Sequence, residues 1–82
     1  MNQRQKVIQA EILQAAALAE PYMLEETLIF TTVNISVKPK ATLSEFDDVC
    51  VEMEKRALIK RIRTADGGLK IKLTDEGKAE LA

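Results

Sequence analysis

Several residue types are scarce or absent in this chain. Its 82 residues include no histidine, no tryptophan and one cysteine. A lone cysteine cannot form a disulfide within the chain, and a chain without histidine offers few zinc ligands and few candidates for general acid–base catalysis. We therefore expect a non-enzymatic protein with no catalytic residues, no metal site and no cofactor, in which Cys50 is a buried structural thiol.

Long hydrophobic runs are also missing. The apolar stretches are far shorter than the roughly 20 residues that a membrane-spanning helix needs. The residues up to Lys6 lead into an amphipathic segment without a signal-peptide cleavage pattern. Because the chain has a single cysteine, a reducing compartment is its natural setting. These features predict a cytoplasmic protein with no membrane partner.

The overall charge excludes a general attraction for polyanions. The formal net charge is −1, with 46% hydrophobic and 30% charged residues. Any affinity for nucleic acid must therefore come from the distribution of charge along the chain. Length and composition predict one domain, residues 1–82, near the lower size limit for a single core. With one tyrosine and two phenylalanines as its aromatic residues, that core is expected to be aliphatic.

The segment from Asn2 to Glu20 is predicted to form the first helix. It contains no glycine, proline or aromatic residue, and alanine, glutamine, glutamate and leucine dominate it. Pro21 ends the helix and is a candidate first residue of the next one. The apolar positions recur at helical spacing and are expected to face the core; they are Ile8, Ile12, Ala15, Ala16 and Ala19.

Residues 22–37 carry conflicting signals. A helical stripe is formed by Leu24, Leu28, Thr31 and Ile35. Residues 27–37 are nevertheless rich in β-branched side chains, and Val33–Val37 alternates like a strand. We predict a helix over Tyr22–Val33 and an extended piece after it, although helix and strand both remain open for residues 27–37. Lys38-Pro39-Lys40 is predicted to be a turn, since proline disfavours a helical residue before it.

The third helix has a recognisable start. Thr42 and Glu45 have the spacing of a capping box, in which the two side chains satisfy backbone amides at the beginning of a helix. The helix is expected to end near Arg56. Its apolar face is formed by Phe46, Val49, Cys50 and Met53.

A β-hairpin and a short helix are predicted to follow. Leu58–Thr64 and Leu69–Leu73 have strand patterns, and Asp66-Gly67 between them is typical of a two-residue type I′ turn. Thr74 is a candidate N-cap for a short terminal helix, with two acidic residues in the first turn.

The two-residue turn fixes an expected register for the hairpin. It places Ile62 opposite Ile71 on the inner face, where both are buried. On the outer face it places Arg63 opposite Lys70, and Arg61 opposite Lys72. The expected core of the hairpin and third helix is Phe46, Val49, Met53, Leu58, Ile62, Leu69 and Ile71.

Two segments carry a resemblance to a known class of proteins. Glu52–Arg63 is similar to the end of a recognition helix that leads into a first wing strand. Leu69–Gly77 is similar to the returning strand with its Leu-Thr-x-x-Gly exit. Together they resemble the MarR-like and PadR-like winged-helix transcription regulators, over about residues 42–81. The resemblance implies a mainly α fold with a small β-hairpin (α+β): a three-helix core, a two-stranded wing and a short C-terminal helix.

The resemblance also implies duplex DNA as the partner. The third helix would be the recognition helix, which reads the DNA bases, and the hairpin would contact the DNA backbone as a wing. With the lysines of the preceding turn included, the candidate nucleic-acid-binding residues are Lys38, Lys40, Thr42, Ser44, Arg61, Arg63, Lys70 and Lys72.

Charge along the second half departs from what a reading helix needs. Thr42–Glu54 contains five acidic residues and no basic one, which gives −5, whereas Lys55–Lys72 contains seven basic residues against Asp66 alone, which gives +6. Carboxylates that face DNA repel its phosphates.

Two hypotheses therefore stand. The first, which we favour, is a DNA-binding transcription regulator that contacts phosphates through its basic wing. The second is a protein-interaction or oligomerisation module that does not bind DNA and uses the acids of the third helix. In either case the alanine-rich first helix is a candidate surface for a homodimer. The protein-binding residues of the second hypothesis are Asp47, Asp48, Glu52 and Glu54.

Overall fold

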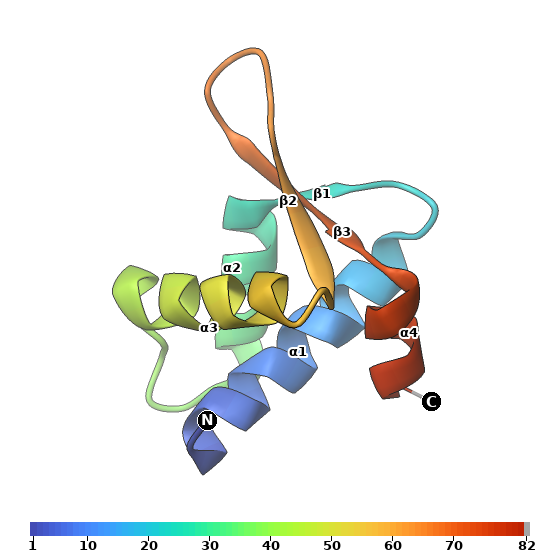
Figure 1. The fold of residues 1–82 in the computed structure, drawn as a ribbon. Helices are drawn as coiled ribbons and strands as arrows, with labels where there is room; N and C mark the ends of the chain where they lie inside the picture. The colour runs from blue at the N-terminus through green and yellow to red at the C-terminus, as the bar shows by residue number, and fades with distance from the viewer. Residues whose placement is uncertain (82) are drawn as a thin grey trace.

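Three helices, with one short strand between the first two, are followed along the chain by a hairpin and a final helix (Figure 1). The computed structural model describes residues 1–81. Within them lie four helices and three strands, which are α1 (Gln3–Ala19), β1 (Leu24–Glu25), α2 (Glu26–Ser36), α3 (Leu43–Lys55), β2 (Ile59–Arg63), β3 (Leu69–Leu73) and α4 (Asp75–Leu81). The predicted α+β class is confirmed, and this element order is compatible with a winged helix. None of these helices has the length and hydropathy to cross a membrane.

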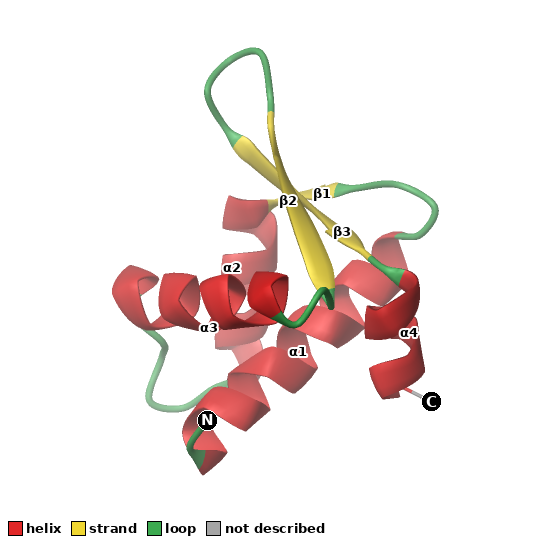
Figure 2. Ribbon diagram, viewed as in Figure 1, coloured by secondary structure: helices red, strands yellow, loops and turns green. Residues whose placement is uncertain are grey.

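The strands form one antiparallel sheet in the order β1-β3-β2 (Figure 2). The predicted hairpin supplies β2 and β3. The third strand, β1, was not predicted: Leu24 pairs with Ile71, and Glu25 pairs with Lys70. This short strand takes the place of the helical turn expected after Pro21, so the second helix begins later than predicted.

The first helix agrees closely with its prediction. Asn2 caps α1 by accepting a hydrogen bond from the Gln5 amide, and the Gln5 side chain accepts one from the Asn2 amide in return. α1 packs against α2, α3, α4 and β3. Its buried residues are Ile8, Ile12, Leu13, Ala15 and Ala16, whereas Ala19 is only half-buried.

The second helix corrects the sequence prediction at both ends. α2 runs from Glu26 to Ser36, so the expected extended piece after Val33 is helical instead. Ile29, Val33 and Val37 lie four residues apart and are all buried, and this packing outweighs the strand preference of β-branched residues. The stripe that the sequence suggested lies on the opposite side, where Leu28 and Ile35 are exposed.

The third helix has the predicted bounds, but only half of the predicted capping box forms, because the Glu45 carboxylate accepts from Arg4 rather than from the Thr42 amide. Its exit is strained. Thr42 caps α3 by accepting from the Glu45 amide at 3.1 Å. At the other end the Leu58 amide donates to the Met53 carbonyl and the Ala57 amide to the Glu54 carbonyl, which is a Schellman motif. Ala57 has φ of +59°, a conformation that usually falls to glycine. This turn directs the chain from α3 into β2.

The hairpin loop is one residue longer than predicted. The Thr64 amide donates to the Gly68 carbonyl at 2.8 Å, and the Gly67 amide donates to the Thr64 carbonyl at 3.0 Å, so three residues separate the closing pair. Gly67 has φ of +87°, whereas Asp66 lacks the positive φ that a type I′ turn requires.

The longer loop shifts the register and exchanges the two faces of β2. Arg61 lies opposite Ile71, and Ile62 lies opposite Lys70, so the predicted pairs are wrong. A shift of one residue moves every side chain of a strand to the other face. Ile62 is therefore 41% exposed, while the Arg61 side chain is only 12% exposed on the inner face.

The core otherwise follows the prediction. Of the seven residues expected in it, Ile62 is exposed and Leu69 is half-buried, and the others are buried, namely Phe46, Val49, Met53, Leu58 and Ile71. Phe30 of α2 meets Phe46 edge to face with ring centroids 5.2 Å apart.

The C-terminal helix closes the base of the hairpin. The Thr74 hydroxyl accepts from the Gly77 amide at 3.0 Å, as the predicted N-cap requires, and also lies 2.8 Å from the Leu58 carbonyl oxygen. Gly77 packs directly against that carbonyl, and a Cβ atom there would overlap it. The Leu-Thr-x-x-Gly exit thus joins the end of β3 to the entrance of β2.

Candidate nucleic-acid interface

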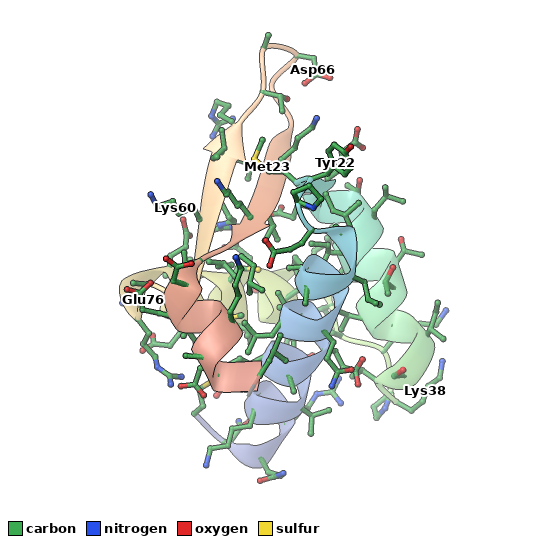
Figure 3. All side chains as sticks on the ribbon, turned by 90° about the vertical axis from the view of Figure 1, so that its right-hand side faces the viewer. Tyr22, Met23, Lys38, Lys60, Asp66 and Glu76 are labelled. Carbon is green, nitrogen blue, oxygen red and sulfur yellow. The ribbon has the colours of Figure 1, made fainter. Side chains whose placement is uncertain are left out.

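The outer face of the hairpin carries a cluster of cations. Lys60 and Lys72 are direct cross-strand neighbours, and Lys70 lies two residues from Lys72 on the same face of β3. Within residues 1–81 none of the three has a carboxylate oxygen within 4.0 Å. Lys60 extends away from α1 and α2 (Figure 3). We call Lys60, Lys70 and Lys72 the outer lysine cluster.

Cross-strand lysines repel each other when nothing lies between them. Directly opposed side chains have Cβ atoms about 5 Å apart, and like charges there are destabilising. The nearest acid by strand pairing is Glu25, which lies beside Lys70 on β1. The cluster therefore has a net positive charge, and an anion bound above it would relieve the repulsion.

Arg61 does not belong to this surface. On the inner face its guanidinium contacts Asp47 at 2.7 Å, Glu54 at 2.8 Å and Glu26 at 3.1 Å. Burial by itself lowers the pKa of Arg61, but the hydrogen bonds that its guanidinium donates to these carboxylates raise it above its ordinary value. Arg61 is thus a charged link between β2, α3 and α2 rather than an available phosphate ligand.

The acids of α3 are divided between internal and exposed roles. Asp47 and Glu54 pair with Arg61, and Glu45 pairs with Arg4 of α1 through contacts of 2.5 and 3.0 Å. The hydrogen bond from Arg4 lowers the pKa of Glu45. Asp48 and Glu52 are exposed and have no basic group within 4.0 Å among residues 1–81.

The remaining candidates do not form one surface with the wing. Lys38, which donates to the Asn34 carbonyl, lies at the far end of the molecule from the hairpin tip at Asp66 (Figure 3). Lys40 is exposed in the same turn, and Ser44 is exposed in the first turn of α3. Of the wing candidates other than Arg61, Arg63 is exposed near the loop, where it donates to the Gly67 carbonyl at 3.4 Å.

One functional candidate was missed at the sequence level. Lys60 was not among the predicted binding residues. The predicted two-residue turn placed Arg61 and Arg63 on the outer face of the hairpin, and therefore Lys60 on the inner face. The signal that could have found it is the Thr64–Gly68 segment, which also fits a three-residue loop with glycine in the left-handed position. Thr42 lies at the start of α3, as expected, but its hydroxyl is used to cap the helix, where it accepts a hydrogen bond from the Glu45 amide.

The thiol and the carboxylates give no sign of a reactive centre in the described part of the chain. Cys50 is buried, as predicted, and desolvation raises the pKa of its thiol to about 12. It is therefore protonated and unreactive near neutral pH. No group of three or more histidine, cysteine, aspartate or glutamate side chains in residues 1–81 is arranged to hold a metal ion.

Comparison with protein-family models, with curated proteins and with solved structures finds no match to this chain.

Proposed function

We propose that this chain is a non-enzymatic winged-helix module, of the kind found in MarR-like and PadR-like transcription regulators, that binds the phosphate backbone of duplex DNA. The outer lysine cluster carries the proposal. It presents three cations on one face of the hairpin, and none of them has an ion-pair partner in residues 1–81, whereas Arg63 lies on the other face near the loop. Such a surface binds phosphates by releasing condensed counterions.

The proposed mode differs from that of a reading helix. Phosphate contacts position a protein on DNA but carry no sequence information. α3 exposes Asp48 and Glu52, whose carboxylates repel phosphates, and the Arg61 face of β2 is turned toward α3. The outer lysine cluster lies on the opposite face of the strand. We therefore propose that the wing makes the principal contact and that binding depends little on base sequence.

A salt titration tests the proposal. Binding of the full chain to a labelled duplex should be measured by fluorescence anisotropy between about 50 and 200 mM salt. Three phosphate contacts predict a log–log slope of about −3. Lys60→Ala with Lys72→Ala should flatten this slope by about 2, because each lost contact removes about 0.9.

The matched control removes the same charge elsewhere. Lys38→Ala with Lys40→Ala deletes two exposed lysines of the α2–α3 turn. This variant should keep a slope within about 0.5 of the parent, since a distant lysine releases few counterions. Equal flattening in both double variants would exclude the wing as the principal contact.

A second candidate function is favoured by one observation on α3. Leu43 is 65% exposed and Val51 is 36% exposed, on the same helix as the exposed carboxylates of Asp48 and Glu52. The exposed apolar side chains would be buried by a partner, and the carboxylates beside them attract positive charge, so this side of α3 suits a basic, partly apolar protein. Absence of DNA binding at about 50 mM salt would favour this function over the first.

A further inference from the structure

The exposed side of α2 carries no charge. Between Glu26 and Lys38 the chain has neither an acidic nor a basic residue. Leu28 is 53% exposed and Ile35 is 71% exposed, and Thr31 and Thr32 are exposed between them. Because residues three, four and seven apart share one side of a helix, these four side chains form a continuous stripe. We call them the α2 stripe.

The threonines of the stripe are less polar than their type suggests. The Thr31 hydroxyl donates to the Thr27 carbonyl at 3.0 Å, and the Thr32 hydroxyl donates to the Leu28 carbonyl at 2.9 Å. With both hydroxyl protons directed to the helix backbone, neither is available as a donor to a partner. A surface that lacks both charges and available donors is best covered by another apolar surface.

The stripe has a projection at one end and a hollow at the other. Leu28 projects from the first turns of α2. Toward the last turn, a shallow hollow is lined by the partly buried Phe30, the buried Ala41 and the exposed Ile35, Lys38 and Lys40, together with Thr31 and Asn34. The two features lie on the same helix, so a second copy of this chain carries both complementary shapes.

The charges at the two ends of the stripe favour an antiparallel contact between two copies. Glu25 precedes α2 and Lys38 follows it, both are exposed, and neither has an oppositely charged partner within 4.0 Å among residues 1–81. Two antiparallel α2 helices related by a two-fold axis between positions 31 and 32 place Leu28 opposite Ile35. They also bring the end that carries Glu25 close to the end of the other helix that carries Lys38. A two-fold contact makes each of these pairs twice.

We propose that two copies of this chain associate by antiparallel packing of α2 against α2, with Leu28 of each copy entering the hollow beside Ile35 of the other. The first helix is a poorer candidate for this interface, because its Ala15 and Ala16 are buried in the core of their own chain. The proposal does not depend on DNA binding.

The size of the surface predicts a weak dimer. An eleven-residue helix is about 16 Å long. Its stripe buries much less than the roughly 800 Å² per partner of a stable interface. We expect a dissociation constant on the order of 0.1 mM, within the range of transient complexes.

Sedimentation equilibrium of the full chain tests the interface. The wild-type chain should change from monomer to dimer between about 20 µM and 1 mM. Ile35→Glu should weaken association by at least about tenfold, because it places two carboxylates in an apolar contact. The control is Leu18→Glu on α1, at a position that is 87% exposed, and it should associate like the wild type. A wild-type monomer throughout, or loss of association in the α1 variant alone, would overturn the proposal.

A charge exchange tests the antiparallel orientation. Glu25→Lys and Lys38→Glu should each weaken self-association, because each creates two like-charge pairs across the dimer. An equimolar mixture of the two variants should associate about threefold to tenfold more tightly than either alone, since two lysine–glutamate pairs form in the mixed dimer. Circular dichroism would show that both variants are folded. A mixture no tighter than its components would contradict the antiparallel contact.

Discussion

The two faces of the β2–β3 hairpin use positive charge in opposite ways. On the inner face, Arg61 is surrounded by carboxylates from α2 and α3 and is largely buried. On the outer face, Lys60 and Lys72 are neighbours with no carboxylate within 4.0 Å in residues 1–81. Arg61 and Lys60 are adjacent residues of β2, and they point to opposite faces of the hairpin. The comparison shows that strand register, rather than the number of basic residues, determines which cations are available to a ligand.

The largest expected effect on stability concerns the base of the hairpin, where α4 packs against the start of β2. Gly77→Ala should destabilise the fold by about 2–3 kcal/mol, because the added methyl group overlaps the Leu58 carbonyl where α4 meets β2. Urea denaturation would measure the loss. The control is Ala79→Gly at an exposed position of the same helix, for which the helix-propensity cost is about 1 kcal/mol or less. A loss under 0.5 kcal/mol in the Gly77 variant would mean that α4 moves away freely.

The next effect compares the two faces directly. Arg61→Ala should cost about 1–3 kcal/mol, because it leaves three carboxylates near one another with no cation; the exposure of Asp47 keeps the value below that of a fully buried pair. Lys60→Ala should cost less than about 0.5 kcal/mol. Thermal unfolding of both variants provides the measurement. Equal losses would contradict the assignment of Arg61 to the inner face.

A smaller effect is expected where α3 turns into β2. Ala57→Gly should stabilise the protein by about 0.5–1 kcal/mol, because glycine adopts the left-handed conformation at this position without a steric penalty. The gain would be read from the denaturation midpoint at an unchanged m-value. Ala65→Gly in the exposed loop is the control, and no gain is expected there. Destabilisation by Ala57→Gly would indicate a different exit from α3.

The smallest effect concerns an acid of α3 outside the Arg61 network. The hydrogen bond from Arg4 holds the pKa of Glu45 below its ordinary value. Such a carboxylate adds stability above its unfolded-state pKa, and this contribution is lost as the pH falls through the lower folded-state pKa. Arg4→Ala should raise the pKa of Glu45, as measured by carbon-detected NMR titration. The pKa of Asp66, which is lowered mainly by the Thr64 hydroxyl, should not move. An unchanged pKa of Glu45 in this variant would contradict the Arg4–Glu45 ion pair.

The helices with local start signals were predicted well from the sequence. Thr42 and Thr74 each cap the helix that follows, as predicted, because a cap depends on residues three or four positions apart. Asn2 was expected inside the first helix and caps it instead. The bounds of α2 could not be predicted in this way. Its β-branched residues favour a strand locally, and only the packing of Ile29 and Val33 against other elements makes the segment helical.

The candidate site was predicted in composition but not in geometry. A basic hairpin was expected, and it is present. Asp66-Gly67 fits both a two-residue and a three-residue loop, and the apolar Ile62 favoured the wrong choice. The ion pairs of Arg61 join positions 26, 47, 54 and 61, and no local pattern links residues so far apart in the sequence.

The most direct test of the central claim is an NMR titration of the isotope-labelled chain with a duplex at about 50 mM salt, a concentration that preserves phosphate contacts. If the outer lysine cluster is the contact, the amide resonances of Lys60, Lys70 and Lys72 shift with DNA, and those of Ser44 and Asp48 at the exposed side of α3 do not. Shifts centred on Ser44 and Asp48, with the amide resonances of the outer lysine cluster unchanged, would contradict the proposed contact. They would identify α3 as the helix that contacts DNA.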